Sequence, residues 1–342
     1  MKNSEVLDAA STRQLIDVHW LRSLDGAAKC YGLNIADGIH QWPEQLARTK
    51  VSLDMLEAAI EVVAKHPRAF DIVIDAGTSI TAMCSGVLGA FLYSAPSVDA
   101  MLKFFEQFSF VFCPAVKLVF IHRQNEKSEL WMLRHDDDKG VPTFSNLGFS
   151  YYCIALITFI RSTQKESCTV EFFFESDPLD EDVLADLEQR FNCRIFYGHK
   201  IRRIAFPSWY VNKASSYANP ELNATLVAPM HFSAKSALNS SLAEQVFAVF
   251  KQYAMDDLTL DTVAAHFHMS SRTLMRKLGA QSLSFRSLLD SYKLEKAISL
   301  SANPNTNLTQ IALELGFRDL SSFSRAFKRW TGETPKSLFK GR

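Results

Sequence analysis

The sequence predicts two domains that differ in fold class. The first is an α+β N-terminal domain with a small, mainly antiparallel sheet. The second is an all-α C-terminal domain in which two helix-turn-helix units are joined by a linker helix. Three observations predict this arrangement. The charge changes sign along the chain, the last hundred residues repeat a helical pattern, and the first two-thirds alternate helical patterns with short aromatic and β-branched runs.

The charge is divided unevenly along the chain, although the formal net charge is +0. Residues 1–241 carry 23 Lys and Arg against 28 Asp and Glu, a net charge of −5, whereas residues 242–342 carry 14 against 9, a net charge of +5. From Met269 onward, 13 basic residues stand against 5 acidic ones, a net charge of +8. A basic end on a neutral chain predicts that this end binds a polyanion.

The N-terminal domain is expected to span residues 1–211. A chain of 342 residues with 47% hydrophobic residues is long enough for two buried cores. Apolar residues at helical spacing predict helices at about 12–31, 52–66, 81–93, 97–111, 143–162 and 180–191. Runs of β-branched and aromatic residues predict strands at 117–123, 129–135, 168–175 and 202–211.

Residues 212–241 are expected to connect the two domains. The segment is rich in Ser, Asn and Ala and contains Pro220 and Pro229, a composition typical of a connector with a short helix in it. After it, the chain is expected to be helical at about 242–254, 260–267, 271–279, 285–300, 308–315 and 320–331.

The C-terminal domain, residues 242–342, contains one pattern twice. The apolar positions of the two copies, in matching order, are Val263, Ala264, Phe267, Met269, Leu274 and Leu278, then Ile311, Ala312, Leu315, Phe317, Phe323 and Phe327. Each copy predicts a helix, a tight turn and a second helix, the first unit at about 260–279 and the second at about 308–331. Gly316 can adopt the positive φ of such a turn, and Ser270 and Asp319 are N-cap residue types.

The second helix of each copy is polar and basic on its outward face. Arg276 and Arg325 occupy the same place, two residues after the buried anchors Leu274 and Phe323. A guanidinium can contact guanine O6 and N7 together, which a lysine cannot do. Flanking basic residues can contact phosphates without reading sequence: Lys277, Lys328 and Arg329.

The linker helix between the copies suggests double-stranded DNA as the ligand. A rigid helix over 285–300 can hold two recognition helices about 34 Å apart, one turn of the duplex. B-form DNA admits a helix into its major groove, whereas the deep, narrow groove of A-form RNA does not.

Residues 242–342 resemble the DNA-binding domain of the AraC/XylS family of bacterial transcription regulators. The resemblance rests on IALELGF, beginning at Ile311, and on SSFSRAFKRWTGETP, which includes Gly332 and Pro335. It implies base contacts by Arg272, Met275, Arg276, Leu320, Ser321 and Arg325. From their outward or flanking positions, DNA-backbone contacts are predicted for Ser271, Lys277, Ser324, Lys328 and Arg329. The sequence departs from the family pattern at His268, at Lys293 and in the LFK segment at 338–340, after Pro335.

Residues 84–108 resemble the effector or dimerisation domain of the AraC-type subgroup that includes ornithine-utilisation and virulence regulators. The resemblance implies a cytoplasmic bacterial one-component regulator, an activator more than a repressor, that forms a homodimer, binds promoter DNA and acts with RNA polymerase. It implies a small-molecule effector, and no residue identifies that effector. Four basic residues stand near potential pockets without being assigned to one: Arg134, Lys200, Arg202 and Arg203. A DNA-binding domain fused to an enzymatic or purely dimerising domain remains the alternative.

Enzyme, cofactor and metal motifs are not found in the sequence. The chain contains no Walker A sequence, GxGxxG, GxSxG or HExxH, so we expect no enzyme, no cofactor and no metal. The acidic run 135–140 lacks the spacing of a calcium loop and is interpreted as a turn. Cys84 is the candidate nucleophile of the enzymatic alternative, and a buried structural cysteine is the favoured interpretation. Scattered cysteines, together with an N-terminus without a signal-peptide core, predict a cytoplasmic location.

Overall fold

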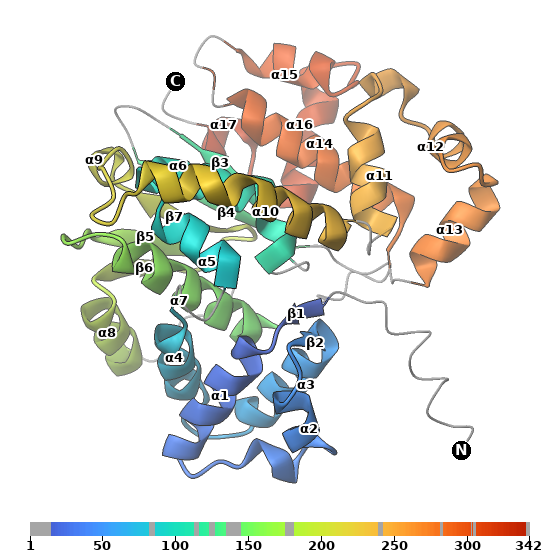
Figure 1. The fold of residues 1–342 in the computed structure, drawn as a ribbon. Coiled ribbons are helices and arrows are strands. Elements are labelled where there is room, and N and C mark those ends of the chain that lie inside the picture. The colour runs from blue at the N-terminus through green and yellow to red at the C-terminus, as the bar shows by residue number, and fades with distance from the viewer. Residues whose placement is uncertain are drawn as a thin grey trace, which may run out of the picture. The chain divides into compact units, whose positions relative to one another are not determined.

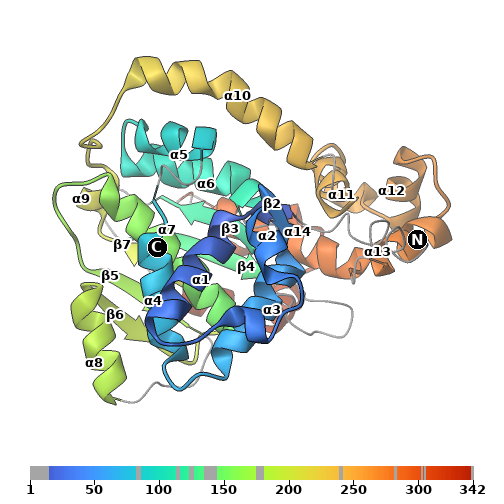
Figure 2. The same ribbon diagram turned by 60° about the horizontal axis from the view of Figure 1, so that its bottom comes forward.

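The computed structural model describes residues 15–81, 86–112, 116–122, 127–134, 145–174, 181–238, 242–280, 283–301, 303 and 306–339. Figures 1 and 2 show the helices and strands of the described residues. Contacts between residues divide the chain into two compact units, each made of several segments. Unit 1 comprises residues 1–115, 144–167 and 212–241, and unit 2 comprises residues 116–143, 168–211 and 242–342.

Unit 1 is built mainly from helices. A two-stranded antiparallel ribbon pairs β1 (Leu15–Asp17) with β2 (Lys50–Ser52). The α-helices of this unit are α1 (His19–Cys30), α2 (Trp42–Leu46), α3 (Leu53–Ala64), α4 (Ala69–Ser79), α5 (Gly86–Tyr93), α6 (Val98–Phe112), α7 (Asn146–Ser162) and α10 (Pro220–Leu238).

The helices of unit 1 cross closely. Helix α4 packs against α1 and α7, and α10 runs along α5 and α6 (Figure 2). A Cβ atom on Gly77 would lie 2.6 Å from Ile154 Cγ2, so a glycine is required where α4 meets α7. Buried Asp25 accepts a hydrogen bond from Trp42 Nε1 at 2.8 Å and pairs with Lys29, which compensates for the burial of its charge.

Unit 2 holds a five-stranded sheet in the order β3-β4-β7-β5-β6. Among the described strands of this sheet, β5 and β6 pair in parallel, and α8 (Glu181–Arg190) lies between them in the chain. The other three pairs are antiparallel, as expected for a mainly antiparallel sheet. The strands are β3 (Val116–Ile121), β4 (Ser128–Arg134), β5 (Val170–Phe173), β6 (Cys193–Phe196) and β7 (Arg202–Phe206).

After residue 242, the described part of the chain is helical. It contains α11 (Leu242–Phe250), a 3-10 turn η3 (Met255–Asp257), α12 (Leu260–His266), α13 (Ser271–Gly279), α14 (Phe285–Ser301), α15 (Leu308–Glu314), α16 (Leu320–Thr331) and α17 (Pro335–Leu338). The predicted all-α C-terminal region is confirmed at this level. The contacts group the sheet with these helices, so the compact units follow other limits than the predicted division at 211 and 241.

Three predictions for the N-terminal two-thirds need correction. The strand expected over 202–211 ends at Phe206, because Pro207 has no N–H to donate, and α9 (Ser208–Val211) follows. The connector 212–241 holds the long helix α10, whose first turn is capped by Asn219 Oδ1, which accepts from the Leu222 amide at 3.0 Å. The helix expected over 12–31 begins only at His19, since residues 15–17 pair as β1. The sequence interpretation also missed α2, α4 and β6.

Candidate nucleic-acid interface

Helices α12 and α13, hereafter the first helix pair, are joined by a tight turn. Ser270 caps α13, its side chain accepting from the Thr273 amide at 3.2 Å. In the turn, His268 has a φ of 54°, and the Met269 amide donates to the Ala264 carbonyl at 2.9 Å. This hydrogen bond and the left-handed residue before it end α12 and redirect the chain into α13.

Helices α15 and α16, hereafter the second helix pair, have the same local construction. Asp319 caps α16 and accepts from the Ser322 amide at 2.7 Å. Gly316 has a φ of 71°, and the Phe317 amide donates to the Ala312 carbonyl at 2.9 Å. The predicted caps and the predicted positive φ of Gly316 are therefore confirmed, and the repeat in the sequence is a repeat in backbone hydrogen bonding.

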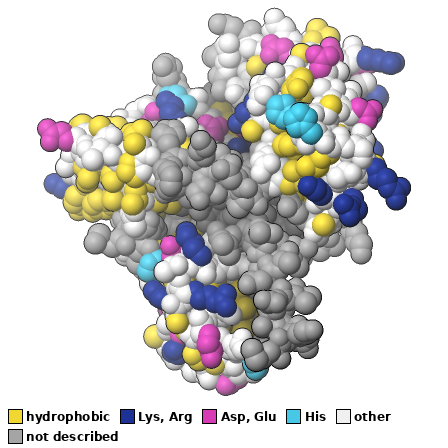
Figure 3. Space-filling view, turned by 45° about the vertical axis from the view of Figure 1, so that its right-hand side comes forward, with side chains coloured by type: hydrophobic (Ala, Val, Ile, Leu, Met, Phe, Trp, Pro, Cys, Tyr) yellow, Lys and Arg dark blue, Asp and Glu magenta, His cyan; other side chains and the backbone are white. Residues whose placement is uncertain are grey.

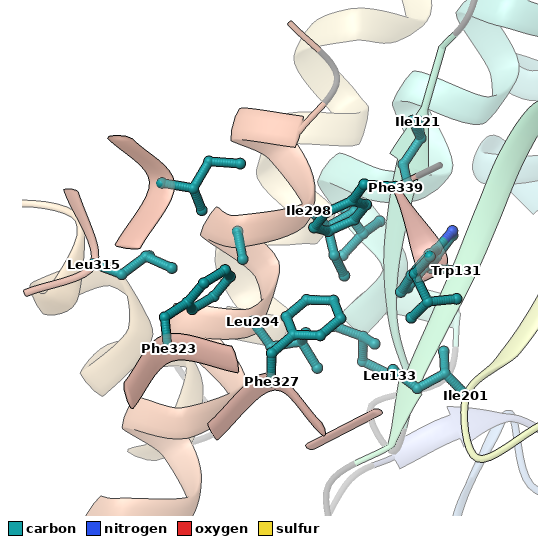
Figure 4. Close-up of a cluster of buried hydrophobic side chains, with 14 of the residues drawn as sticks. Ile121, Trp131, Leu133, Ile201, Leu294, Ile298, Leu315, Phe323, Phe327 and Phe339 are labelled. Carbon is teal, nitrogen blue, oxygen red and sulfur yellow. The ribbon is translucent and has the colours of Figure 1, made fainter. Parts of the chain in front are cut away.

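Helix α14 contributes one end to each of two hydrophobic cores. Leu288 and Tyr292 belong to the core of the first helix pair, together with Leu274 and Leu278. Further along, Leu294, Ala297 and Ile298 belong to the core of the second helix pair (Figure 4). Because both pairs bury their apolar faces against one continuous helix, their outward faces keep a fixed relation to that helix.

The residues predicted to contact bases lie on the outward faces of α13 and α16. Arg272 and Arg276 are exposed, and Met275 keeps 51% of its surface accessible. On α16, Leu320 is 36% exposed, and Ser321 and Arg325 are exposed as well. Arg325 Nη2 donates to Ser322 Oγ at 3.2 Å, a contact that orients the guanidinium along its own helix.

The residues predicted to contact the DNA backbone differ in their exposure and in their partners within the protein. Lys277 and Lys328 are exposed, and Ser324 is half-buried. Ser271 donates to Asp261 on α12, and Arg329 Nη2 lies 3.1 Å from Asp290 Oδ2 on α14. Ser271 and Arg329 therefore already have partners within the protein, whereas the side chains of Lys277 and Lys328 are exposed.

Basic side chains are exposed on several of the C-terminal helices, and two charged groups there have shifted pKa values. Figure 3 shows Lys and Arg side chains at several places on the part of the molecule that carries the C-terminal helices. The hydrogen bond from the Ser322 backbone amide holds the pKa of Asp319 below its usual value. Lys293 Nζ lies 4.9 Å from the centroid of the Phe317 ring, and burial lowers the pKa of this lysine. Lys293 therefore packs against the Phe317 ring.

Other functional signals in the described residues are few. No cluster of three or more His, Cys, Asp or Glu side chains there is arranged to hold a metal ion. No helix in those same segments is long and apolar enough to cross a bilayer. Cys84 and the acidic run 135–140 lie outside the described residues, as does the side chain of Arg134. Arg202 and Arg203 are buried in β7, and Lys200 binds a backbone carbonyl in α16.

Comparisons with known proteins point to the same region. Residues 263–341 match a family model described as "Helix-turn-helix domain", a segment that contains most of the first helix pair and all of the second. The HTH-type transcriptional regulator VqsM of Pseudomonas aeruginosa is 29% identical over 133 residues, which cover 38% of this chain and 41% of that protein. The ornithine utilization regulator of the same species is 37% identical over 76 residues, 22% of each chain.

These matches cover less than half of either relative. Among solved structures, the transcriptional regulator CdpR from Pseudomonas aeruginosa aligns with 95% of this chain and 98% of its own, at 19% identity and a TM-score of 0.49.

Proposed function

We propose that this chain is a sequence-specific DNA-binding transcription regulator whose matched helix-turn-helix domain is of the AraC type. One observation carries the proposal. Two helix pairs with matching turns and caps present arginines at the same place, Arg276 and Arg325, on faces that the protein leaves exposed. VqsM, which matches 133 residues of this chain, is named as an HTH-type transcriptional regulator, which supports the same conclusion.

In this proposal, the two helix pairs are helix-turn-helix units that enter successive major grooves. Arg276 and Arg325 bind guanine edges, while Met275 and Leu320 offer apolar contacts suited to thymine methyl groups. Arg272 and Ser321 complete the base-reading set. The contacts from Lys277, Lys328 and the neighbouring Ser271, Ser324 and Arg329 set the register on the phosphates. Helix α14 keeps the two units at the separation that one face of the duplex requires.

The rest of the chain supplies control in this proposal. We infer that a small-molecule effector acts through the N-terminal part by stabilising the DNA-competent arrangement more than the alternative. The protein then activates transcription with RNA polymerase at promoters in the bacterial cytoplasm. The proposal includes no enzymatic step, in line with the regulators that match the chain.

Dimerisation is the third part of the proposal, and unit 1 offers a surface for it. Helix α10 has no Lys, Arg, Asp or Glu from residue 222 to residue 234, and α5, on which it packs, has none at all. Val87, Leu222 and Val227 on these helices are 43%, 43% and 40% exposed. Helical surfaces with few charges and exposed aliphatic side chains favour a protein partner over water.

The dimer is tested by measuring molecular mass at increasing protein concentration. The wild type is expected to reach the mass of two chains, and Leu222→Glu is expected to remain at the mass of one. A wild type that stays monomeric at all concentrations and on DNA would contradict this part of the proposal alone.

The DNA-binding function is tested by a genome-wide occupancy map of the wild type and the Arg276→Ala/Arg325→Ala double variant. Each substitution is expected to cost about 1–3 kcal/mol of specific binding and to relax base preference at its own position. Discrete wild-type peaks should disappear in the double variant, and the genes beside them would nominate the effector.

Lys328→Ala serves as the matched control, because it removes a positive charge from the same helix without removing a base contact. It should weaken binding evenly across sequences and reduce the dependence of affinity on salt. Wild-type and double-variant maps that coincide would mean that these faces do not read DNA.

A further inference from the structure

The sheet of unit 2 reaches the C-terminal end of α16 through the loop that joins β6 to β7. Lys200, in this loop, donates from Nζ to the backbone carbonyl of Arg329 at 2.6 Å. That carbonyl belongs to the last turn of α16, where carbonyl groups have no partner within the helix. A lysine there both satisfies a hydrogen-bond acceptor and complements the negative end of the helix dipole.

The same loop also fits closely against the residue that ends α16. Gly332 has a φ of 80°, and a Cβ atom at this position would lie 2.9 Å from Lys200 Cβ. The stem of Lys200 therefore rests on the bare Cα of Gly332. Next to it, His199 Nδ1 lies 3.1 Å from Glu333 Oε1. Two successive loop residues thus hold the residues on both sides of the helix end.

A hydrophobic core continues from the sheet into the second helix pair (Figure 4). Trp131, Leu133 and Ile201 are buried in one cluster with Phe323 and Phe327. The Trp131 ring stacks on Phe339 with 6.5 Å between centroids. Lys117 on β3 and Glu295 on α14 approach to 3.7 Å, both largely buried. The sheet therefore supports α14, α16 and the segment after α16 together.

The first helix pair has no such support in the described part of the chain. Its core is built from α11, from α12 to α14 and from residues in the turns between them, and none of the described strand residues belongs to it. The contact between the sheet and the helices leaves the outward face of α16 open, since Ser321, Arg325 and Lys328 remain exposed beside it. The sheet thus holds the back and the end of α16 without covering its proposed reading face.

We propose that Lys200 is a positioning residue for the second helix-turn-helix unit, an inference that rests on the proposed DNA-binding function. By fixing the last turn of α16 to the sheet, Lys200 sets the angle at which α16 enters its major groove. A change in the sheet then alters the half-site read by α16, while the half-site read by α13 keeps its affinity.

The inference is tested with Lys200→Met, which keeps the aliphatic stem on Gly332 and removes the hydrogen bond to Arg329. A DNA fragment from a wild-type occupancy peak is footprinted, and Arg325→Ala identifies the half-site that α16 reads. Lys200→Met should lose protection at that half-site only and weaken total affinity roughly 3- to 10-fold, the range of one hydrogen bond. Lys200→Arg, which restores a charged donor, should recover most of the protection.

Two readouts separate positioning from other roles. A phosphate contact by Lys200 itself would lower the slope of log affinity against log salt by about 1, whereas a positioning residue leaves the slope unchanged. A purely structural role would lower the thermal midpoint and weaken both half-sites. The inference is overturned if Lys200→Met protects both half-sites as the wild type does, weakens both equally, or reduces the salt slope. Failure of the wild type to protect any specific site would instead overturn the proposed function.

Discussion

The two helix pairs share their backbone design and differ in what stands behind them. In both, the amide three residues past the first helix donates to a carbonyl inside that helix: Met269 to Ala264 and Phe317 to Ala312, each at 2.9 Å. Both second helices begin with a side-chain cap, from Ser270 and from Asp319. Yet the first pair packs on α11, whereas the second shares its core with the sheet.

This difference shows that a repeated motif need not have repeated neighbours. The spacing of apolar residues within each copy specifies the fold of the pair, because each second helix must bury its anchors against the first. That spacing does not specify which other element packs against the core of each pair. The consequence is that the two units can differ in stability and in their response to the rest of the protein.

The largest expected loss of stability comes from truncating one buried anchor in each helix pair, and it tests whether the two pairs have separate cores. Phe323→Ala is expected to lower the free energy of unfolding by about 3–5 kcal/mol and Leu274→Ala by about 2–5 kcal/mol, because each removes a fully buried side chain. Hydrogen exchange should show that Phe323→Ala also reduces the protection of β3 and β4, while Leu274→Ala leaves both strands protected. Equal loss of strand protection in both variants would contradict the division into two cores.

The C-terminal helices could be predicted from the sequence because their signals are local. The helices expected at 271–279 and 320–331 coincide with α13 and α16, and the caps at Ser270 and Asp319 lie where N-cap residue types occur. The candidate reading faces follow from the same periodicity, so the outward positions of Arg276 and Arg325 could be named in advance.

The support from the sheet could not be predicted. Lys200 and Arg329 are separated by 129 positions in the chain, and no local pattern pairs them. From the sequence, Lys200 could be named only as one of four basic residues without an assigned role. The length of α10 was missed for a different reason, because a Ser- and Ala-rich segment with two prolines has the composition of a linker, and only its packing on α5 and α6 makes it a long helix.

A smaller effect sharpens the comparison at the two turns. Gly316 and His268 occupy the same place and both have positive φ, 71° and 54°. Gly316→Ala should cost about 1–2 kcal/mol of stability, because an L-residue is strained there. Its Cβ would also stand 3.1 Å from Asp256 Oδ1 and 3.2 Å from Met255 Cγ.

His268→Ala is the matched control for this change. The strain of an L-residue is already present at position 268, and the side chain is exposed, so stability should change by less than about 0.5 kcal/mol. Urea unfolding of the wild type and of both variants measures these two changes in the free energy of unfolding. Equal losses in the two variants would mean that the turns are not constrained in the same way.

The smallest effect concerns the two caps, which differ in that only one of them titrates. Ser270→Ala should lower stability by about 1 kcal/mol at every pH, since a hydroxyl cap carries no charge. The pKa of Asp319 lies below its ordinary value, and the largest cause is the hydrogen bond that its carboxylate accepts from the Ser322 backbone amide. The charged form of Asp319 is therefore favoured in the folded state. A folded pKa below the unfolded one contributes stability above about pH 4, the unfolded value, and this contribution is lost as the pH falls through the folded pKa.

Asp319→Asn isolates that contribution, because asparagine caps a helix as well as aspartate but carries no charge. The wild type should be more stable than Asp319→Asn near pH 6, and the difference should shrink as the pH falls below about 4. Urea unfolding of the wild type, Asp319→Asn and Ser270→Ala, once near pH 6 and once below about pH 4, provides the comparison. A difference between wild type and Asp319→Asn that does not change with pH would show that the charge of Asp319 adds nothing to the cap. The two caps would then be equivalent, and the asymmetry between the helix pairs would lie only in the surfaces behind them.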